Sequence, residues 1–349
     1  MKRVAFAVPG SLETPTGGYA YDRRIIAELN RLGWAIELVD VGEGFPWPSE
    51  AIRSSARARL LTVPAGCPIV IDGLALGVLP DVAAELASHH PLLALVHHPL
   101  ALEAGLSVER ADSLRRSEQS ALATVAQVVV TSPATARILV SDYGVSSDCI
   151  TVVRPGNDPV PHARGSRQDT LHLLSVGSVI PRKGFDLLVS ALAPLVGLPW
   201  RLTIAGDLTR DPAAAAKLRT CITHHGLSDR IAILGAVPSE QLAALYDSAD
   251  LFVLASSFEG YGMAYAEALA HGLPVVGTTG GAIPETVPPD AGLLVPAGDT
   301  SALTEALHRT IPDSALRLRL SEAAVAAAGR LPTWPQSGEI FAGVLARLA

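Results

Sequence analysis

The feature that most limits the fold of this chain is a regular alternation of short apolar runs with longer helical patterns. The apolar runs of the first half predict strands at Val4–Val8, Ile36–Val41, Ile69–Ile71, Leu92–Val96 and Val128–Thr131. Helical stretches stand between them, for example Tyr19–Leu32, which Gly33 ends as a C′ residue. Strands separated by helices predict parallel sheets covered on both faces, so the expected fold class is α/β.

The alternation lapses once, in the segment 155–170, PGNDPVPHARGSRQDT, whose Pro, Gly and polar residues predict a linker. Beyond it, strands are expected at Leu171–Val176, Arg201–Ala205, Ile231–Leu234, Leu251–Ala255, Pro274–Gly277 and Gly292–Val295. A chain of 349 residues is also too long for one ordinary core. We therefore expect two Rossmann-like domains, 1–158 and 159–330, followed by a helix at 331–349. Ligands of such folds bind at the carboxyl ends of strands, and a cleft between the domains is the expected site.

Composition excludes several classes of function. The net charge of −7 gives no general attraction to nucleic acid. Three scattered cysteines, without a CxxC pair, predict neither a disulfide framework nor a zinc site and fit a reducing cytosol. The start, MKRVAFAVPG, is too short for a signal peptide, and the most apolar window is broken by prolines and Asp72. The expected location is cytoplasmic.

A glycine-rich turn, VPGSLETPTGGYAY, follows the first expected strand and opens a helix. Gly17 and Gly18 would let a ligand approach the backbone, and the helix N-terminus offers amides to an anion. The alternative is a flexible loop whose glycines serve only the turn. The spacing is not GxGxxG, which disfavours a nicotinamide dehydrogenase.

Two histidines, His97 and His98, follow the apolar run LLALV and precede a proline. At the end of a strand, an imidazole can hydrogen-bond a polar substrate or handle a proton near neutral pH. Ordinary loop histidines are an equal alternative. A metal site is not indicated, because no third ligand stands at a recognisable spacing.

A basic pair, Arg182 and Lys183, lies at the turn between an expected strand and helix in SVGSVIPRKGFDLLVSAL. Such a pair suits a diphosphate, because Arg can fork onto two oxygens and Lys is a compact charge. The alternative is a solvated basic turn. Lysine is rare here, occurring only at positions 2, 183 and 217, and this favours a functional role.

Two glutamates, Glu259 and Glu267, flank a Gly-Tyr-Gly turn in SSFEGYGMAYAEALAHGLPVV. The turn would free amides at the start of a helix for an anion, and Glu267, about one turn in, could accept bonds from vicinal hydroxyls such as those of a ribose. The alternative is that Glu259 is a solvated loop residue and Glu267 an ordinary acid in the first turn of a helix.

The segment EGYGMAYAEALAHGLPVVGTTGGAIPE closely resembles the E-x7-E region of retaining glycosyltransferases of the GT4 family, which have the GT-B fold. Further segments resemble the same family in the same order: PTGGYAYDRRIIAELNRLGW, LVHHP, ITVVRPGNDP and GSVIPRKGFDLLV. The resemblance spans nearly the whole chain. It implies two Rossmann-like domains, an acceptor-side one first, with the last helix crossing back to it.

The resemblance also implies roles for the acidic and basic residues. Glu267 would bind the donor ribose, Glu259 the transferred sugar and Lys183 a phosphate. His97 matches the family position near the reacting sugar, where it would orient the sugar and steady positive charge. The family usually has an arginine where Ser178 stands, and Arg182 is the candidate replacement.

Backbone contacts are implied as well. Gly262, Met263 and Ala264 would meet sugar or phosphate, Gly17 and Gly18 would lie against the diphosphate, and the donor base would lie near Val237. Since no DxD motif occurs, neither a metal nor another cofactor is expected. The leaving diphosphate would be stabilised by the cations and helix N-termini, and hinge motion is expected near Pro155–Pro161.

The resemblance therefore predicts transfer of a hexose from a nucleotide sugar, with UDP the first expectation and GDP the second, to a hydroxyl acceptor by same-face displacement. A nucleotide-sugar epimerase, a sugar phosphorylase and a non-catalytic glycan-binding protein stay open as alternatives. The acceptor, the linkage and the oligomeric state cannot be read from the sequence. Arg110, Arg115 and Arg116 favour a solvated helix face, with weak docking to an anionic membrane as the alternative.

Overall fold

A computed structural model describes residues 2–348, which divide into two compact units. The first unit holds the residues up to Gly156 and those from Pro332 on, and the second unit is Asn157–Leu331. The division falls after Gly156, close to the boundary expected at residue 158. The last helix is counted with the first unit, so that unit is built from two separate stretches of chain.

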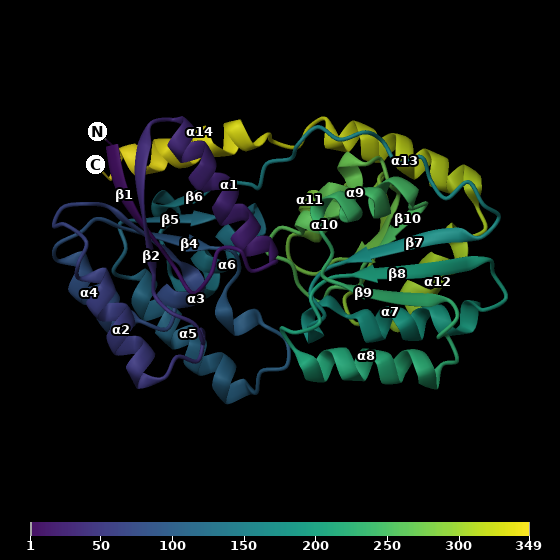
Figure 1. Cartoon of the computed structure of the whole chain (residues 1–349), viewed down its shortest axis with the longest axis horizontal. Coiled ribbons are helices and arrows are strands. Elements are labelled where there is room, and N and C mark those ends of the chain that lie inside the picture. Colours follow the sequence, from purple (N-terminus) through teal and green to yellow (C-terminus); the bar gives the residue numbers. More distant parts are fainter. Residues whose placement is uncertain (1, 349) are drawn as a thin grey trace. The chain divides into compact units, whose positions relative to one another are not determined.

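The first unit contains a six-stranded sheet in which every neighbouring pair is parallel (Figure 1). Its strands are β1 (Lys2–Val8), β2 (Trp34–Asp40), β3 (Ile69–Asp72), β4 (Leu92–Val96), β5 (Gln127–Val130) and β6 (Ile150–Val152), in the order β2-β1-β3-β4-β5-β6. Strands β3 and β4 are buried along their whole length, as central parallel strands should be. The edge strand β6 is half-buried, and its short sequence ITV gave no strand signal.

Helices of the first unit cover the sheet. They are α1 (Gly17–Arg31), α2 (Glu50–Leu60), α3 (Gly73–Leu76), α4 (Pro80–Ala87), α5 (Val108–Leu122), α6 (Pro133–Tyr143) and α14 (Trp334–Ala346), with short 3₁₀ turns η1 (Leu100–Leu102) and η2 (Ser147–Cys149). Thr16 caps α1 by accepting a hydrogen bond from the amide of Tyr19, and the left-handed Gly33 follows its end. The helix expected at Tyr19–Leu32 is therefore confirmed, with its start two residues earlier.

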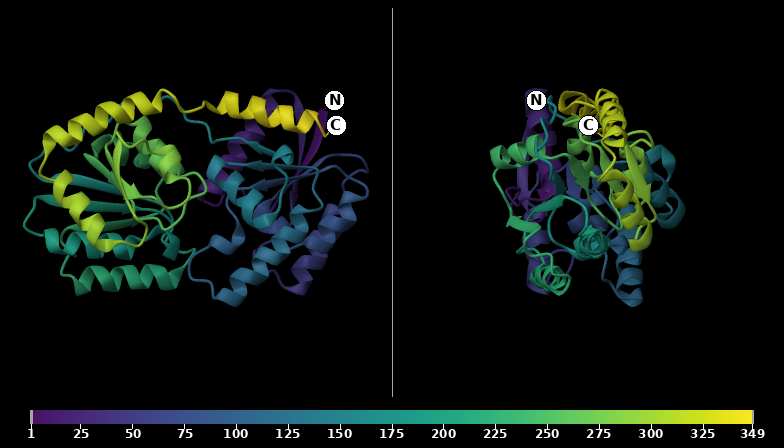
Figure 2. Two further views of the ribbon diagram at one scale, coloured as in Figure 1. Left: turned by 180° about the vertical axis from the view of Figure 1, so that it is seen from behind. Right: turned by 90° about the vertical axis from the view of Figure 1, so that its right-hand side faces the viewer.

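The C-terminal helix α14 packs against α1, and the left view of Figure 2 shows it along one side of the first unit. It begins with a capping box between Thr333 and Gln336. Gly338 allows close contact, because a Cβ there would lie 2.4 Å from the Cβ of Glu28. Phe341 is fully buried, with its ring 6.4 Å from that of Phe6 in β1.

The second unit repeats the architecture with another six-stranded parallel sheet. Its strands are β7 (Leu171–Val176), β8 (Trp200–Ala205), β9 (Ile231–Gly235), β10 (Leu251–Val253), β11 (Val275–Thr278) and β12 (Gly292–Val295), in the order β12-β11-β10-β7-β8-β9. Its helices and turns are η3 (Pro181–Lys183), α7 (Phe185–Leu192), η4 (Ala193–Leu195), α8 (Pro212–His224), α9 (Ser239–Ser248), α10 (Met263–Ala270), α11 (Ile283–Thr286), α12 (Thr300–Thr310) and α13 (Ser314–Ala328). All six strands expected in this half are confirmed to within two residues.

Strand order locates the place where each sheet can bind a ligand. In the first sheet the chain turns one way from β1 to β2 and then places β3 on the other side of β1. In the second sheet β8 and β10 lie on opposite sides of β7. Loops leaving two adjacent strands in opposite directions form a crevice at their carboxyl ends. The expected sites are thus the β1/β3 edge of the first unit and the β7/β10 edge of the second.

Candidate functional site

The second unit gathers opposite charges at its β7/β10 edge. The 3₁₀ turn η3 follows β7 and carries Arg182 and Lys183, while Glu259 lies in the loop after β10. Nζ of Lys183 lies 2.6 Å from Oε1 of Glu259, and Nη1 of Arg182 lies 3.2 Å from Oε2. The side chain of Glu259 is only 8% exposed, so this group is a buried ion cluster rather than a solvated loop acid.

Neighbouring backbone holds this cluster together. Nη1 of Arg182 also donates to the carbonyl of Phe258, at 2.7 Å. Gly177 gives Lys183 its path, because a Cβ at this glycine would lie 3.1 Å from Cε of the lysine. Gly184 is left-handed, and a Cβ there would come within 2.2 Å of the carbonyl of Ala255. The turn therefore aims both cations at the loop that follows β10.

The electrostatics of Glu259 follow from this arrangement. Burial alone would raise its pKa, but the charges of Lys183 and Arg182, with hydrogen bonds from Lys183 and Ser256, lower it to about 2. Glu259 is therefore ionised at neutral pH. One carboxylate thus faces two cations across this edge of the sheet.

The glycine turn between the two glutamates also has a clear geometry. Gly262 is left-handed, with φ of 90°, and it stands at the N-cap of α10. The amides of Tyr265 and Ala266 both donate to its carbonyl. The amides of Met263 and Ala264 precede these bonds, at the positive end of the helix, where an anion is favoured.

Glu267 lies one turn into α10 and has a buried tyrosine partner that sequence reasoning missed. The hydroxyl of Tyr246 donates to Oε2 of Glu267 at 2.8 Å. The Tyr246 ring stacks on His271, with centroids 4.9 Å apart and an interplanar angle of 8°. Burial raises the pKa of Glu267, and the bond from Tyr246 and the charge of Lys183 oppose this rise. The only signal for Tyr246 in the sequence is general: a buried tyrosine hydroxyl needs a partner.

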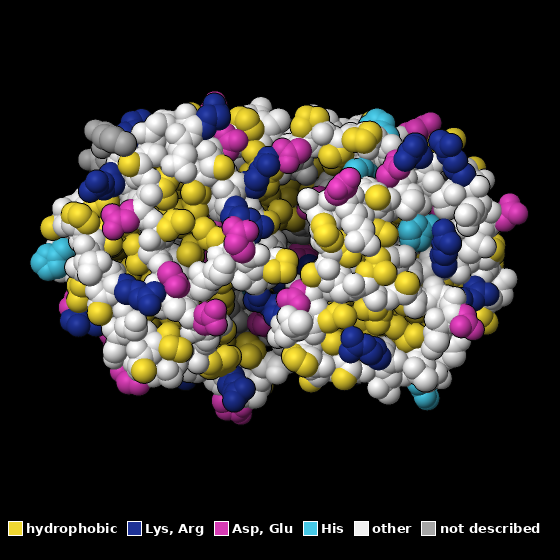
Figure 3. All heavy atoms as spheres, viewed as in Figure 1, with side chains coloured by type: hydrophobic (Ala, Val, Ile, Leu, Met, Phe, Trp, Pro, Cys, Tyr) yellow, Lys and Arg dark blue, Asp and Glu magenta, His cyan; other side chains and the backbone are white. Residues whose placement is uncertain are grey.

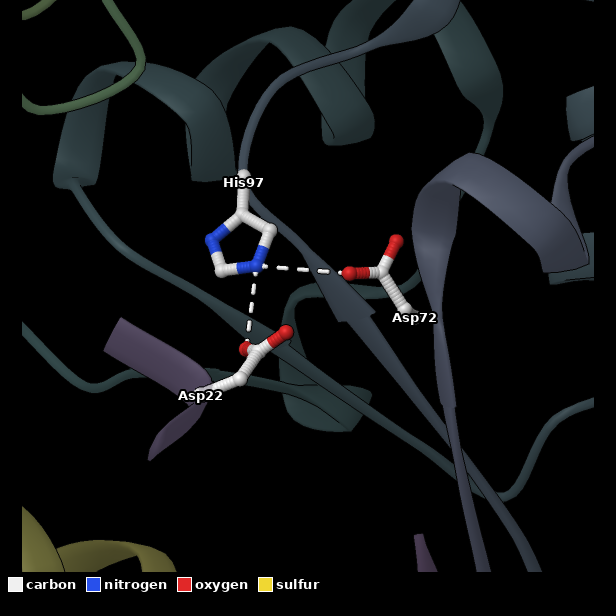
Figure 4. Close-up of side chains that lie close together, drawn as sticks. All are labelled: Asp22, Asp72 and His97. Carbon is white, nitrogen blue, oxygen red and sulfur yellow. Dashed lines mark hydrogen bonds and ion pairs between the residues drawn. The ribbon is translucent and has the colours of Figure 1, made fainter. Parts of the chain in front are cut away.

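The first unit gathers a second cluster at its β1/β3 edge (Figure 4). Asp22 comes from α1, Asp72 ends β3 and caps α3, and His97 follows β4. Nε2 of His97 lies 3.2 Å from Oδ1 of Asp22 and 3.6 Å from Oδ2 of Asp72. Sequence reasoning found the histidine but neither aspartate, because only the topology brings these three elements together.

Burial governs the charges of this cluster too. It raises the pKa of Asp22 to about 6, although His97 acts in the opposite direction. It would lower the pKa of His97, but Asp22 and Asp72 outweigh it and raise that pKa to about 10. At neutral pH the ring is therefore an imidazolium held between carboxylates.

Other residues expected at the site lie at various distances from these clusters. A Cβ on Gly18 would lie 3.3 Å from Cδ2 of His97, so the glycine turn does border the histidine. His98 faces Glu103 instead, at 3.4 Å. Val237 follows the edge strand β9, and β8 separates that strand from β7.

Within residues 2–348, the one group with the spacing of a metal site is Asp22, Asp72 and His97, whose ligand atoms lie within 4.8 Å of one another. A metal-bound histidine almost always donates its other ring N–H to a carboxylate, carbonyl or water. Among the described residues, Nδ1 of His97 has no such protein partner. The 3.2 Å contact fits a proton shared between Nε2 and Asp22.

Among the residues that the structure describes, no helix has the length and apolar character to cross a membrane.

The architecture and its solved relatives define the GT-B class of fold. Sucrose-phosphate synthase from Thermosynechococcus elongatus superposes with a TM-score of 0.84 and 20% identity, over 100% of this chain and 99% of that one. HepE of Anabaena, solved with UDP and glucose, superposes with a TM-score of 0.81 at 20% identity, with full coverage of both chains. At this level of identity the likeness establishes the fold.

Sequence comparison gives the family. Residues 160–326, nearly all of the second unit, match the model of the family described as "Glycosyl transferases group 1", so this unit belongs to that family. An MMP alpha-(1->4)-mannosyltransferase of Mycolicibacterium hassiacum is 28% identical over 79% of this chain and 69% of its own length. A D-inositol 3-phosphate glycosyltransferase of Xylanimonas cellulosilytica is 32% identical, over 66% of this chain and 59% of its own length. The resemblance to GT4 glycosyltransferases is thereby confirmed.

Proposed function

We propose that this protein transfers a hexose from a nucleoside diphosphate sugar to a hydroxyl acceptor with retention of configuration and without a metal ion. The observation that carries the proposal is the β7/β10 edge of the second unit. There Lys183 and Arg182 converge on buried Glu259, next to the N-terminus of α10. Fixed cations and helix amides are the groups that stabilise a departing diphosphate.

Each residue of this edge has a place in the proposed donor complex. Lys183 supplies a compact charge and Arg182 a forked one to the phosphates, so Arg182 takes the part of the arginine that Ser178 replaces. Glu259 holds the two cations in place and accepts from hydroxyls of the transferred sugar. The amides of Met263 and Ala264 face the phosphate or the sugar.

Glu267 is proposed to bind the ribose of the donor. Its Oε2 is occupied by the hydroxyl of Tyr246, which leaves Oε1 to accept from the ribose hydroxyls. The base is proposed to be uracil, with guanine second. The HepE structures contain UDP, whereas two of the sequence relatives are named for mannosyl products.

Relatives also suggest where the search for an acceptor should begin. The names D-inositol 3-phosphate glycosyltransferase, mannosylfructose-phosphate synthase and sucrose-phosphate synthase all contain a phosphorylated polyol or sugar. We therefore propose this acceptor class as the first to be screened. Basic and acidic side chains are interspersed on the face in Figure 3, which favours a small-molecule acceptor over nucleic acid.

Thermal unfolding with UDP, GDP, ADP and dTDP, each with and without EDTA, tests the donor. A ligand at a hundred times its Kd adds about 2.7 kcal/mol to stability. We expect one nucleotide to stabilise the protein equally in EDTA, and Glu267→Ala to remove the effect while Glu305→Ala, an exposed acid on α12, does not. Stabilisation by no nucleotide, or only with metal, would contradict the proposal.

Product analysis then separates the reaction classes. Retaining transfer requires an acceptor and gives a product with the anomeric configuration of the donor. An epimerase converts the nucleotide sugar with no acceptor, and a phosphorylase requires inorganic phosphate. Nucleotide binding with none of these products would favour a non-catalytic role.

A further inference from the structure

The His97 cluster has a geometry that assigns different tasks to the two ring nitrogens. Figure 4 shows Nε2 facing both carboxylates and Nδ1 on the side of the ring away from them. Asp22 and Asp72 are 0% and 3% exposed, whereas the His97 side chain is 20% exposed. The ring therefore separates a buried acidic pair from the accessible side of the site.

The neighbours of the ring fix its orientation. Gly18 lies against the Cδ2 edge, and the ring of Tyr21 meets it edge to face with centroids 5.4 Å apart. The hydroxyl of Thr131 donates to the backbone carbonyl of His97 at 3.2 Å. The first two contacts hold the ring from α1, and the third holds the backbone of His97 from the end of β5.

The buried carboxylates depend on this histidine. Oδ2 of Asp22 is buried and has no hydrogen-bond donor among the described residues, so Nε2–H of His97 is the main compensation for that charge. Asp72 also accepts a hydrogen bond from the backbone amide of Leu74, at 2.7 Å. Of the other titratable groups, Tyr21 faces the ring from α1, and burial raises its pKa so far that it stays neutral. The charge on the ring thus reflects the two aspartates.

We propose that Asp22 and Asp72 are positioning residues that hold His97 as an imidazolium, with Nδ1–H free to donate to a ligand oxygen that bears negative charge. The histidine then accepts no proton during the reaction. The inference rests on the proposed function only in taking His97 to face the substrate. Both aspartates act through the histidine and touch no ligand themselves.

A cationic ring changes the part that His97 plays in transfer. One imidazolium faces two aspartates, so the cluster as a whole does not repel positive charge, and what this role adds to the expected steadying of the anomeric centre is a hydrogen-bond donor at Nδ1. A phosphate oxygen of the donor, or of a phosphorylated acceptor, is the kind of group it favours. The N-terminus of α1, where Gly18 lies against this ring, favours the negative charge of such an oxygen.

Nuclear magnetic resonance of the full chain labelled with ¹⁵N-histidine tests the protonation directly. The chain has ten histidines, and His97→Gln identifies the signals of His97 by their loss. We expect both nitrogens of His97 to remain protonated from pH 5 to 9 in the wild-type protein. Asp22→Asn and Asp72→Asn should each lower the pH at which His97 is half deprotonated, its titration midpoint, by about 1–2 pH units. The double substitution should lower this midpoint further.

The control is Asp112→Asn, which removes an exposed acid of α5 and should leave the midpoint unchanged. A wild-type midpoint below about pH 7.5, within reach of ordinary histidines, would overturn the proposal. So would unchanged midpoints in both aspartate variants. The titration of wild-type His97 can overturn the proposal by itself, so the test does not depend on whether the aspartate variants fold.

Metal binding is a separate outcome of the same experiment. Zn²⁺ or Mn²⁺ at stoichiometric concentration should leave the His97 signals unchanged, and a specific shift reversed by EDTA would overturn the proposal in favour of a cation site. None of these readouts requires transferase activity, so failure of the proposed function leaves this test intact. With an active assay, Asp72→Asn should add a limb to the pH profile of kcat/KM near the lowered midpoint, whereas the wild-type profile lacks one.

Discussion

The two units carry buried charge clusters of opposite design at equivalent places in their sheets. In the first, a single imidazolium lies between two aspartates; in the second, the single carboxylate of Glu259 lies between Lys183 and Arg182. Each central group is held in its charged form by two opposite charges. The pKa of His97 rises to about 10, and that of Glu259 falls to about 2.

The difference shows how the same fold can present different chemistry at its switch points. The acidic pair of the first unit outnumbers its single cation and leaves one N–H facing away from the two carboxylates. The basic pair of the second unit holds its carboxylate in the ionised form. Strand order determines where each cluster lies in its sheet. The residues at and after the strand ends determine whether the central group of the cluster is a cation or an anion.

Removal of the central carboxylate should have the largest effect. Glu259→Ala leaves Lys183 and Arg182 buried without their shared anion, and breaking such a buried pair costs about 3–5 kcal/mol. Urea unfolding at neutral pH measures the loss, with Glu305→Ala as the exposed control. A loss below about 1 kcal/mol would mean that the cluster behaves as a solvated surface pair.

Dependence on pH should differ in sign between the clusters. The depressed pKa of Glu259 adds stability that is present above pH 4.5 and lost as the pH falls towards 2, by about 3 kcal/mol. The raised pKa of His97 adds stability that is fully present below pH 6.5 and lost as the pH rises towards 10. The difference in unfolding free energy between the wild-type protein and Glu259→Gln should therefore change with pH in the acidic range, below pH 4.5. The difference between the wild-type protein and His97→Gln should change in the basic range, above pH 6.5. Coincident windows would contradict the comparison.

Two glycines of α14, Gly338 and Gly343, test how closely this helix packs on α1. Gly338→Ala would place a Cβ 2.4 Å from that of Glu28, and such overpacking costs about 1–3 kcal/mol. Gly343→Ala on the same helix meets nothing within 4 Å and should be neutral or stabilising by up to about 1 kcal/mol. Equal effects in thermal unfolding would mean that α14 does not pack closely on α1.

The smallest predicted effect concerns the tyrosine partner of Glu267. Tyr246→Phe removes the hydroxyl that donates to Glu267 and, at 3.4 Å, to the carbonyl of Ala264. The bond to Glu267 is worth about 1 kcal/mol, so the nucleotide that stabilises the wild-type protein should bind about fivefold more weakly. Isothermal titration calorimetry measures the change. Tyr143→Phe, in the first unit, is the matched control and should leave nucleotide affinity unchanged.

The sequence was informative where a pattern repeats or a local turn is encoded. Alternation of strand and helix predicted both sheets, and the glycines around Glu259 predicted the turn at which α10 begins. The strand β6 was missed because three residues at a sheet edge are too few to establish a period. Its ITV also lies where the chain approaches the division between the units.

Long-range partners could not be predicted from one sequence. Asp22 lies mid-helix and Asp72 ends a strand, 50 residues apart in the chain, and neither carries a local signal for His97. Tyr246 and Glu267 likewise stand on different helices. Such pairs depend on the order of strands in the sheet, which local periodicity does not specify.

The division of the first unit into two stretches of chain has a consequence for biosynthesis. A ribosome releases β1 to β6 first, then the whole second unit, and only afterwards the 18 residues that include α14. Domains generally fold as they emerge, so the second unit can reach its native state while Phe6 and Glu28 still await their helix. A stop codon just before Pro332 would therefore damage the earliest-made half of the protein and spare the half made last.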